Sequence, residues 1–282
     1  MALNELLLKM RVGGWCILES VIPPDVVADV RESVLSTVEE IGSRSSFAPS
    51  GVQVIAGLIN RNQSFAPYLV DEHLIELITE LLGAHFRVSF TTALVNDPGS
   101  DRGQWHADWP YIQTLGARLP APYPDVVTHV TTLFMLSDFT PETGATYVLP
   151  GSHRASTNPT ADIGVDRYSR VPGEVQACGE AGSVMVLDSR LWHAAAPNRS
   201  GDPRSAVGVR FAPWWLNLEV LRPNSFQRRQ IVEHNGKPDG PVPSVPRHVY
   251  HRLPIEVQPL FHHWIERETD EGESESPSMI EM

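Results

Sequence analysis

The chain has 282 residues, of which 41% are hydrophobic and 20% are charged, the proportions of a globular protein. Its net charge of −12 gives no basis for nucleic-acid binding, and its two cysteines, Cys16 and Cys178, are too few for a disulfide framework. No stretch approaches the roughly 20 apolar residues that cross a membrane, and residues 1–11 do not resemble a signal peptide. We therefore expect a cytoplasmic protein without a membrane partner.

The first part of the chain predicts helices. Over residues 23–42 the apolar positions recur every three or four residues, which is typical of an amphipathic helix. A proline and an aspartate in its first turn and a glycine at its end support this prediction. A second helix is predicted over residues 71–83. The pattern of residues 43–70 is mixed and leaves that segment unassigned.

From residue 85 the pattern changes to short strands separated by turn residues. β-Branched and aromatic residues, or nearly continuous apolar runs, predict strands at 85–96, 126–139, 182–193 and 204–215. No helical pattern interrupts this region, so a parallel sheet with alternating helices is excluded. The pattern favours a mainly β sandwich or barrel with flanking helices packed outside it.

The end of the chain adds little to this core. One short helix is predicted over residues 254–265. Residues 266–282 contain seven acidic residues and one arginine among few apolar side chains, which is the composition of a disordered tail. We therefore expect a single domain over residues 1–265, followed by an acidic tail at 266–282.

The stretch QWHADW places His106 and Asp108 one residue apart, so in an extended segment both side chains project from the same face. Alone, this pair fits either a metal site or a polar pair at the end of a strand. His193, at the end of a second apolar strand, adds another imidazole. Two histidines and one carboxylate from separate strands make the facial triad that holds iron(II) with three open positions. Zinc hydrolases usually draw their ligands from HExxH, which this chain lacks.

The strand after His193 carries arginines suited to an acidic ligand. In RSAVGVRF, Arg204 and Arg210 share one face with an alanine and a glycine, whereas valines and a phenylalanine occupy the other face. A guanidinium pairs bidentately with a carboxylate, so Arg204 can hold the far end of a dicarboxylic keto acid bound to iron. A salt bridge at the rim of the fold is the alternative interpretation.

Four separated motifs, in this order, resemble the phytanoyl-CoA dioxygenase family of iron(II)- and 2-oxoglutarate-dependent oxygenases. The motifs are the opening GGWCILESVIPPDVVADVR, HAD at 106–108, FTPETGATYVLPGSHR at 139–154 and WHAAAPNRSGDPRSA at 192–206. The resemblance covers roughly residues 12–215 and implies a double-stranded β-helix, the cupin-like jelly-roll core. It also implies Fe(II), 2-oxoglutarate as co-substrate, O2 as oxidant, and hydroxylation of a small-molecule substrate.

The resemblance also implies roles for particular residues. Carried over by position, His106, Asp108 and His193 are the metal ligands and form the catalytic centre. Arg204 stands eleven residues after the distal histidine and matches the arginine that binds the distal carboxylate of 2-oxoglutarate. Arg210 is the fallback for this role. Relatives that halogenate lack the carboxylate ligand, so Asp108 favours hydroxylation or a related oxidation.

Five further positions match the family less directly. Gln104 and Trp109 stand where the family lines its substrate pocket and are predicted to bind substrate. His153 of PGSH is predicted to be structural, and Asn198 is predicted either to hold its turn or to contact a ligand. Ala195 is a departure, because many relatives have a hydroxyl residue there that helps to hold the co-substrate.

Two other classes of protein remain open. A cupin-like metalloprotein that does not use 2-oxoglutarate would share the triad and give Arg204 no role. A catalytically inactive binding module would need none of the three ligands. Titration with 2-oxoglutarate distinguishes these alternatives from an oxygenase.

Overall fold

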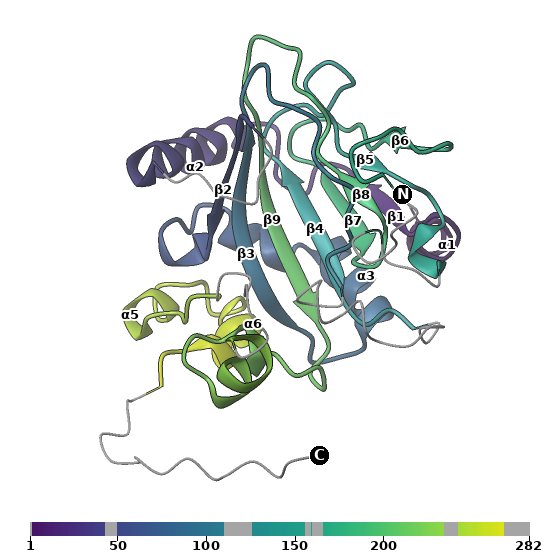
Figure 1. The fold of residues 1–282 in the computed structure, drawn as a ribbon. Coiled ribbons are helices and arrows are strands. Elements are labelled where there is room, and N and C mark those ends of the chain that lie inside the picture. Colours follow the sequence, from purple (N-terminus) through teal and green to yellow (C-terminus); the bar gives the residue numbers. More distant parts are fainter. Residues whose placement is uncertain are drawn as a thin grey trace.

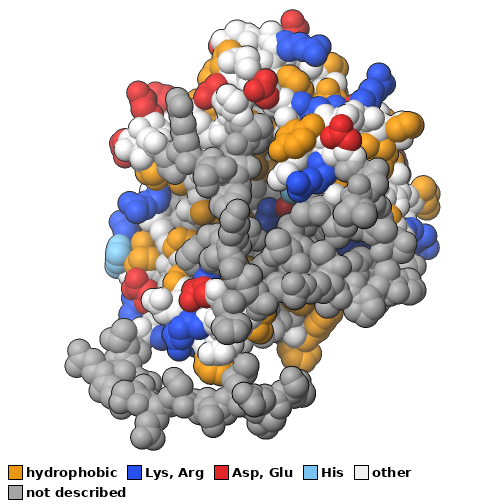
Figure 2. Space-filling view, in the orientation of Figure 1, with side chains coloured by type: hydrophobic (Ala, Val, Ile, Leu, Met, Phe, Trp, Pro, Cys, Tyr) orange, Lys and Arg blue, Asp and Glu red, His pale blue; other side chains and the backbone are white. Residues whose placement is uncertain are grey.

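The computed structural model describes residues 2–42, 50–109, 126–155, 159, 166–233 and 242–267. Except for residues 266 and 267, the predicted acidic tail lies outside this part of the chain. On the face shown in Figure 2, acidic and basic side chains of the described residues are interspersed with apolar and neutral ones. Within the described ranges, no helix combines the length and the apolar character that crossing a membrane requires.

A six-stranded antiparallel sheet forms the largest layer of the molecule (Figure 1), with strand order β1-β7-β4-β9-β3-β2. Its strands are β1 Trp15–Leu18, β2 Val52–Ala56, β3 Arg87–Asn96, β4 Val130–Met135, β7 Val184–Asp188 and β9 Arg204–Ala212. Strand β4 lies between two neighbours, and all six of its residues are buried. Its central position explains the nearly continuous apolar run in the sequence.

A smaller sheet faces the large one and completes the predicted jelly-roll core. Its order is β6-β5-β8, with strands β5 Tyr147–Val148, β6 Val175–Gln176 and β8 His193–Ala194. The interior between the sheets contains an apolar cluster with members from β4, β7 and β9, including Leu133, Leu187 and Ala206. The predicted fold class, mainly β with flanking helices, is confirmed.

The long helices cover the opposite face of the large sheet. They are α1 Leu3–Gly13, α2 Val27–Ile41 and α3 Glu72–Leu82. Figure 1 shows α2 beside the β2 edge and α1 beside the β1 edge. Side chains such as Leu6, Val34 and Leu77 pack with Val207 and Val209 of β9 in the main hydrophobic core. The remaining helical turns are η1 Leu58–Asn60, η2 Ala66–Val70, η3 Ser152–Arg154, η4 Glu219–Leu221, η5 Arg228–Glu233, α5 Arg247–Tyr250, α6 Gln258–Phe261 and η6 His262–Trp264.

The helix predicted over residues 254–265 is shorter than expected. The structure has a four-residue helix, α6, followed by the 3-10 turn η6. Pro259 stands in the first turn of α6, where its missing N–H costs nothing, and a helix running through it from residue 254 would lose a backbone hydrogen bond. The proline therefore sets where this helix begins.

Candidate metal centre

The backbone brings the two predicted histidines together. His106 forms an isolated antiparallel bridge with His193, in which each N–H donates to the other residue's carbonyl, at 3.0 and 2.9 Å. Directly opposed residues of an antiparallel pair project to the same face. The two imidazole ring centroids consequently lie 4.2 Å apart.

Asp108 completes the group from the turn that follows His106. Its carboxylate oxygens lie 3.8 Å from Nε2 of His106 and 3.6 Å from Nε2 of His193. The candidate ligand atoms of the three residues all lie within 4.8 Å of one another, so they could hold one metal ion. These are the three residues that the sequence identified, and the structure brings them together.

Hydrogen bonds fix both imidazoles with Nε2 directed toward the shared site. Nδ1 of His106 lies 3.0 Å from the carbonyl oxygen of Gln104, and Nδ1 of His193 lies 2.9 Å from that of Leu191. A carbonyl only accepts hydrogen bonds, so Nδ1 carries a proton in each ring, and in the neutral form of the ring Nε2 is the nitrogen with a lone pair for a metal. This arrangement is the usual one for histidines that bind a metal.

Asp108 is buried but held in its ionised form. Its carboxylate accepts hydrogen bonds from Thr131 Oγ1 at 2.8 Å and from Arg210 Nη2 at 2.7 Å. Burial alone would raise the pKa of this carboxyl, but Arg210, the two histidines and Thr131 outweigh burial and lower it. One anionic oxygen and two neutral imidazole nitrogens form a donor set that suits iron(II).

The surroundings of His106 keep its imidazole ring neutral. Burial lowers its pKa to about 4, with His193 adding to this effect and Asp108 opposing it. Its side chain still remains 37% exposed, so the ligand cluster is open to small molecules from this side. At neutral pH His106 therefore needs to lose no proton before it can bind a metal.

Arg204 is a buried cation without an anion. It is only 3% exposed, and its guanidinium carbon lies 4.4 Å from the centroid of the Phe139 ring. Among the described residues it has no ion pair, and its Nε has no hydrogen-bond partner. Burial lowers the pKa of this guanidinium to about 10, which still leaves it protonated at neutral pH. Such a group offers a site for an incoming carboxylate.

Two residues predicted to bind substrate flank the triad. Gln104 is half-buried, and its backbone carbonyl holds the ring of His106. Trp109 is half-buried too, and its backbone N–H donates to the carbonyl of Ser189 at 3.0 Å. Residues 110–125, which follow Trp109, lie outside the described residues.

Asn198 is hydrogen-bonded within its own turn, whereas His153 is packed against a glycine. The side-chain amide of Asn198 donates to the carbonyls of Asn96 and Asp202 at 2.9 and 2.8 Å, and its oxygen accepts from Ser200. Asn198 therefore holds its own turn. His153 is buried and close to Gly14, where an added Cβ would lie 2.4 Å from His153 Nδ1. The tight approach of this ring to a glycine backbone is that of a packing residue.

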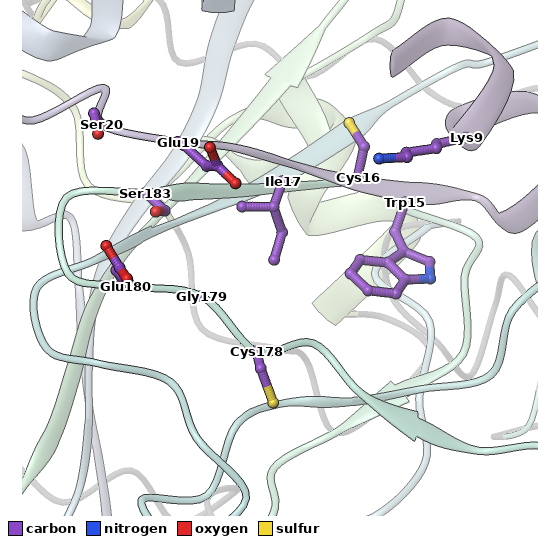
Figure 3. Close-up of a pocket in the computed structure, with 10 residues that line it drawn as sticks. All are labelled: Lys9, Trp15, Cys16, Ile17, Glu19, Ser20, Cys178, Gly179, Glu180 and Ser183. Carbon is purple, nitrogen blue, oxygen red and sulfur yellow. The ribbon is translucent and has the colours of Figure 1, made fainter. Parts of the chain in front are cut away.

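A second cavity lies away from the triad, at the β1 edge of the large sheet (Figure 3). It encloses about 460 Å³. Trp15 and Ile17 of β1 line it together with Cys178 and Glu180 of the facing segment. None of the residues predicted to bind metal, co-substrate or substrate borders this cavity.

Sequence reasoning missed the groups that support Asp108. Thr131, Ser189 and His129 are buried polar residues near this carboxylate, and none was singled out. A signal existed, because a histidine and three threonines interrupt the apolar run VVTHVTTLFML. Buried polar residues at such positions need partners within the fold.

A jelly-roll core that brings two histidines and a carboxylate together defines a non-haem iron oxygenase. Residues 10–206 match the family model for phytanoyl-CoA dioxygenase, and the chain belongs to this family. It is an Fe(II)- and 2-oxoglutarate-dependent dioxygenase by class.

Similar proteins include an uncharacterized bacterial protein, a fungal dioxygenase and a solved structure that shares the fold. An uncharacterized protein of Mycobacterium tuberculosis is 26% identical over 218 residues, which cover 73% of this chain and 74% of that protein. Dioxygenase trt7 of Aspergillus terreus is 29% identical over 231 residues, with 76% of each chain covered. The crystal structure of HygX from Streptomyces hygroscopicus, with nickel, 2-oxoglutarate and hygromycin B bound, shares the fold. Its TM-score is 0.59 at 16% identity, over 76% of this chain and 88% of HygX.

Proposed function

We propose that this protein couples the oxidative decarboxylation of 2-oxoglutarate to the hydroxylation of a small organic molecule. His106, Asp108 and His193 would hold the Fe(II) ion, which supplies the power to oxidise a C–H bond when 2-oxoglutarate and O2 are present. The proposal rests on one observation: the same core contains both this set of metal donors and Arg204. Arg204 is a buried guanidinium that has no acidic partner among the described residues.

Arg204 is proposed to bind the distal carboxylate of 2-oxoglutarate. Its planar fork matches a carboxylate bidentately, and the low polarity around it strengthens that pair. Directly opposite Arg204 on β3 is Asn96, which is also buried. The amide nitrogen of Asn96 makes only a long 3.4 Å hydrogen bond, to the carbonyl of Ala196. We assign to Asn96 the second hydrogen bond to this carboxylate, which Ala195 cannot supply because it has no hydroxyl.

The substrate is proposed to bind on the exposed side of His106, with Gln104 and Trp109 beside it. Alternation along the extended segment puts Gln104 on the same face as His106. Binding of substrate there would cover the open side of the ligand cluster and exclude water from it. HygX was crystallised with hygromycin B, which supports a small molecule as the substrate class here.

Anaerobic titration of the purified protein with Fe(II) and then 2-oxoglutarate tests the proposal. We expect stoichiometric metal binding followed by 2-oxoglutarate binding that depends on the metal, measured by calorimetry and by the visible charge-transfer band of the complex. Admitting O2 should then yield succinate. Metal binding without 2-oxoglutarate binding would instead support the cupin-like alternative, and no metal binding would support an inactive binding module.

Asp108→Ala should abolish metal binding, because it removes the only anionic donor of the cluster. Asp101→Ala is the matched control, since this carboxylate is exposed and lies only seven residues earlier in the chain. Circular dichroism should show both variants folded. Equal metal affinity in the two variants would refute the assignment of Asp108.

A further inference from the structure

A line of buried hydrogen bonds runs from Asp108 into the protein interior. Thr131 Oγ1 donates to Asp108 Oδ2 at 2.8 Å and lies 2.8 Å from the hydroxyl of Ser189. That hydroxyl lies 2.7 Å from Nδ1 of His129, whose Nε2 lies 2.8 Å from the hydroxyl of Ser89. Ser89, Ser189 and His129 are 0% exposed and Thr131 is 4% exposed, so these side chains find their partners within the protein.

The chemistry of the groups fixes the direction of every bond in this line. A hydroxyl has one proton, and Thr131 gives its proton to the carboxylate, so it must accept from Ser189. Ser189 has then used its proton and must accept from His129, which places a proton on Nδ1. Neutral His129 leaves Nε2 bare to accept from Ser89.

His129 is neutral for a physical reason. Burial, followed by the charge of Arg210, lowers its pKa to about 3, and the opposing effect of Asp108 is smaller. The line of bonds therefore keeps one orientation at neutral pH. The hydrogen-bond line therefore orients the side chains along it, and His129 does not take up an extra proton at neutral pH.

The line draws on β3, the β4 region and the residue after β7, with β9 lying between β3 and β4. Ser89 stands at an irregularity in the pairing of β3 with β9, between Val88 and Phe90. Bulges of this kind redirect side chains next to functional sites. His129 directly precedes β4, Thr131 is the second residue of β4, and Ser189 follows β7 directly.

Arg210 lies beside both ends of this line, but Ser89 gives its one proton to His129 and has none left for the Arg210 carbonyl. The backbone carbonyl of Arg210 lies 3.2 Å from the hydroxyl of Ser89, and its guanidinium donates to Asp108 Oδ1 at 2.7 Å. Asp108 is thus held at Oδ1 by a charged donor and at Oδ2 by the end of the hydrogen-bond line. With both oxygens held, the carboxylate is fixed in rotation, and each oxygen keeps a lone pair for a metal.

We propose that His129 is a positioning residue for the metal centre, which acts through Ser189 and Thr131 to fix the orientation of the Asp108 carboxylate. This inference rests on the proposed function, because it assigns the oriented carboxylate to a metal. His129 itself touches none of the three ligands in the hydrogen bonds described above. His129 contributes the proton on Nδ1. That proton sets the direction of two further hydrogen bonds, from Ser189 to Thr131 and from Thr131 to Asp108.

A pair of threonine variants tests the end of the line. Thr131→Val removes the hydroxyl that reaches Asp108 and keeps the side-chain shape. We expect it to weaken Fe(II) affinity by about 10-fold or more, the usual effect of losing a partner behind a ligand. Thr132→Val is the matched control, because Thr132 is equally buried on the same strand but donates at 2.8 Å to the carbonyl of Val209. It should lose stability and keep its metal affinity.

A pair of histidine variants tests the inner part of the line. In His129→Asn the amide nitrogen can take the place of Nδ1 and still donate to Ser189, whereas in His129→Gln it reaches the position of Nε2 instead. We expect metal affinity close to wild type for His129→Asn. For His129→Gln and for Ser189→Ala we expect a loss of about 10-fold.

Anaerobic Fe(II) titration of each folded full-length variant gives the result. Wild-type affinity in Thr131→Val, or an equal loss in Thr132→Val, would overturn the inference while the proposed function stood. Equal affinity of the two His129 variants would also overturn it. If neither His129 variant folds, Thr131→Val and Ser189→Ala decide. Absence of metal binding by the wild-type protein would overturn both the proposed function and this inference.

Discussion

The two ends of strand β9 present the same side chain in opposite surroundings. Arg204 and Arg210 project from the same face of the strand, six residues or about 20 Å apart. Arg210 is paired with Asp108 at 2.7 Å, and 29% of its side chain is exposed. Arg204 is almost fully buried over Phe139 without an ion pair among the described residues.

This difference shows that one strand can carry a cation paired within the protein at one end and, at the other, the cation proposed to bind 2-oxoglutarate. At the Arg210 end, cation and carboxylate are both present in the protein, so the pair is complete before any ligand arrives. At the Arg204 end the described residues offer no acidic partner, and burial lowers the pKa of the guanidinium to about 10. The sequence shows two arginines on one face but does not distinguish these states.

The largest expected effect is on co-substrate binding. Arg204→Met should raise the Kd for 2-oxoglutarate by about 100-fold, because truncating one member of a buried charge pair costs about 3 kcal/mol. Arg210→Met should change this Kd much less, since Arg210 pairs with the protein's own carboxylate. Calorimetry at saturating Fe(II) measures both values. If only Arg210→Met raised this Kd, Arg210 and not Arg204 would be the residue that binds the distal carboxylate of 2-oxoglutarate.

The same two substitutions should change the stability of the metal-free protein in opposite directions. Arg210→Met leaves Asp108 buried without its cation and should lower the free energy of unfolding by about 2 kcal/mol, less than for a fully buried pair. Arg204→Met replaces an uncompensated buried charge with an apolar side chain and should raise the free energy of unfolding by about 1 kcal/mol. Urea unfolding without metal or 2-oxoglutarate measures both. Changes of the same sign would contradict the comparison.

The last expected effect concerns pH at the Arg210 end. The pKa of folded His129 is about 3, so below the ordinary histidine value of about 6.5 the unfolded chain binds a proton that the folded chain does not. Stability should therefore fall with decreasing pH, with His129 contributing about 1.4 kcal/mol per pH unit between about pH 6 and 4. His129→Asn should remove that contribution from urea unfolding curves. His73→Asn, at an exposed position of α3, should not.

The sequence predicted elements that are either clearly amphipathic or buried on both faces. Helix α2 packs buried valines at the spacing that the sequence displays, and β4 is as continuously apolar as its central position requires. Helix α1 was not predicted, because only Leu6 and Met10 of its 11 residues are buried. Strand β2 lies in the segment that the sequence left unassigned and is short and partly exposed.

The candidate metal centre also has parts that the sequence predicted and parts that it did not. Residue type and spacing were enough to identify His106, Asp108 and His193, because few side chains can bind iron. The support of Asp108 depends instead on strand register, which places Thr131 opposite Arg210 on one neighbour of β4 and opposite Leu187 on the other. Register arises from the whole sheet, so no local pattern reveals it.

The bridge between His106 and His193 also limits how this scaffold can be re-engineered. A one-residue slip of their pairing would turn one ring outward and separate the two donors. Insertions or deletions meant to alter substrate choice therefore belong in segments whose length does not set this pairing. Libraries built on this chain should vary the side chains of Gln104 and Trp109, keep His106 and Asp108, and keep the number of residues in this segment constant.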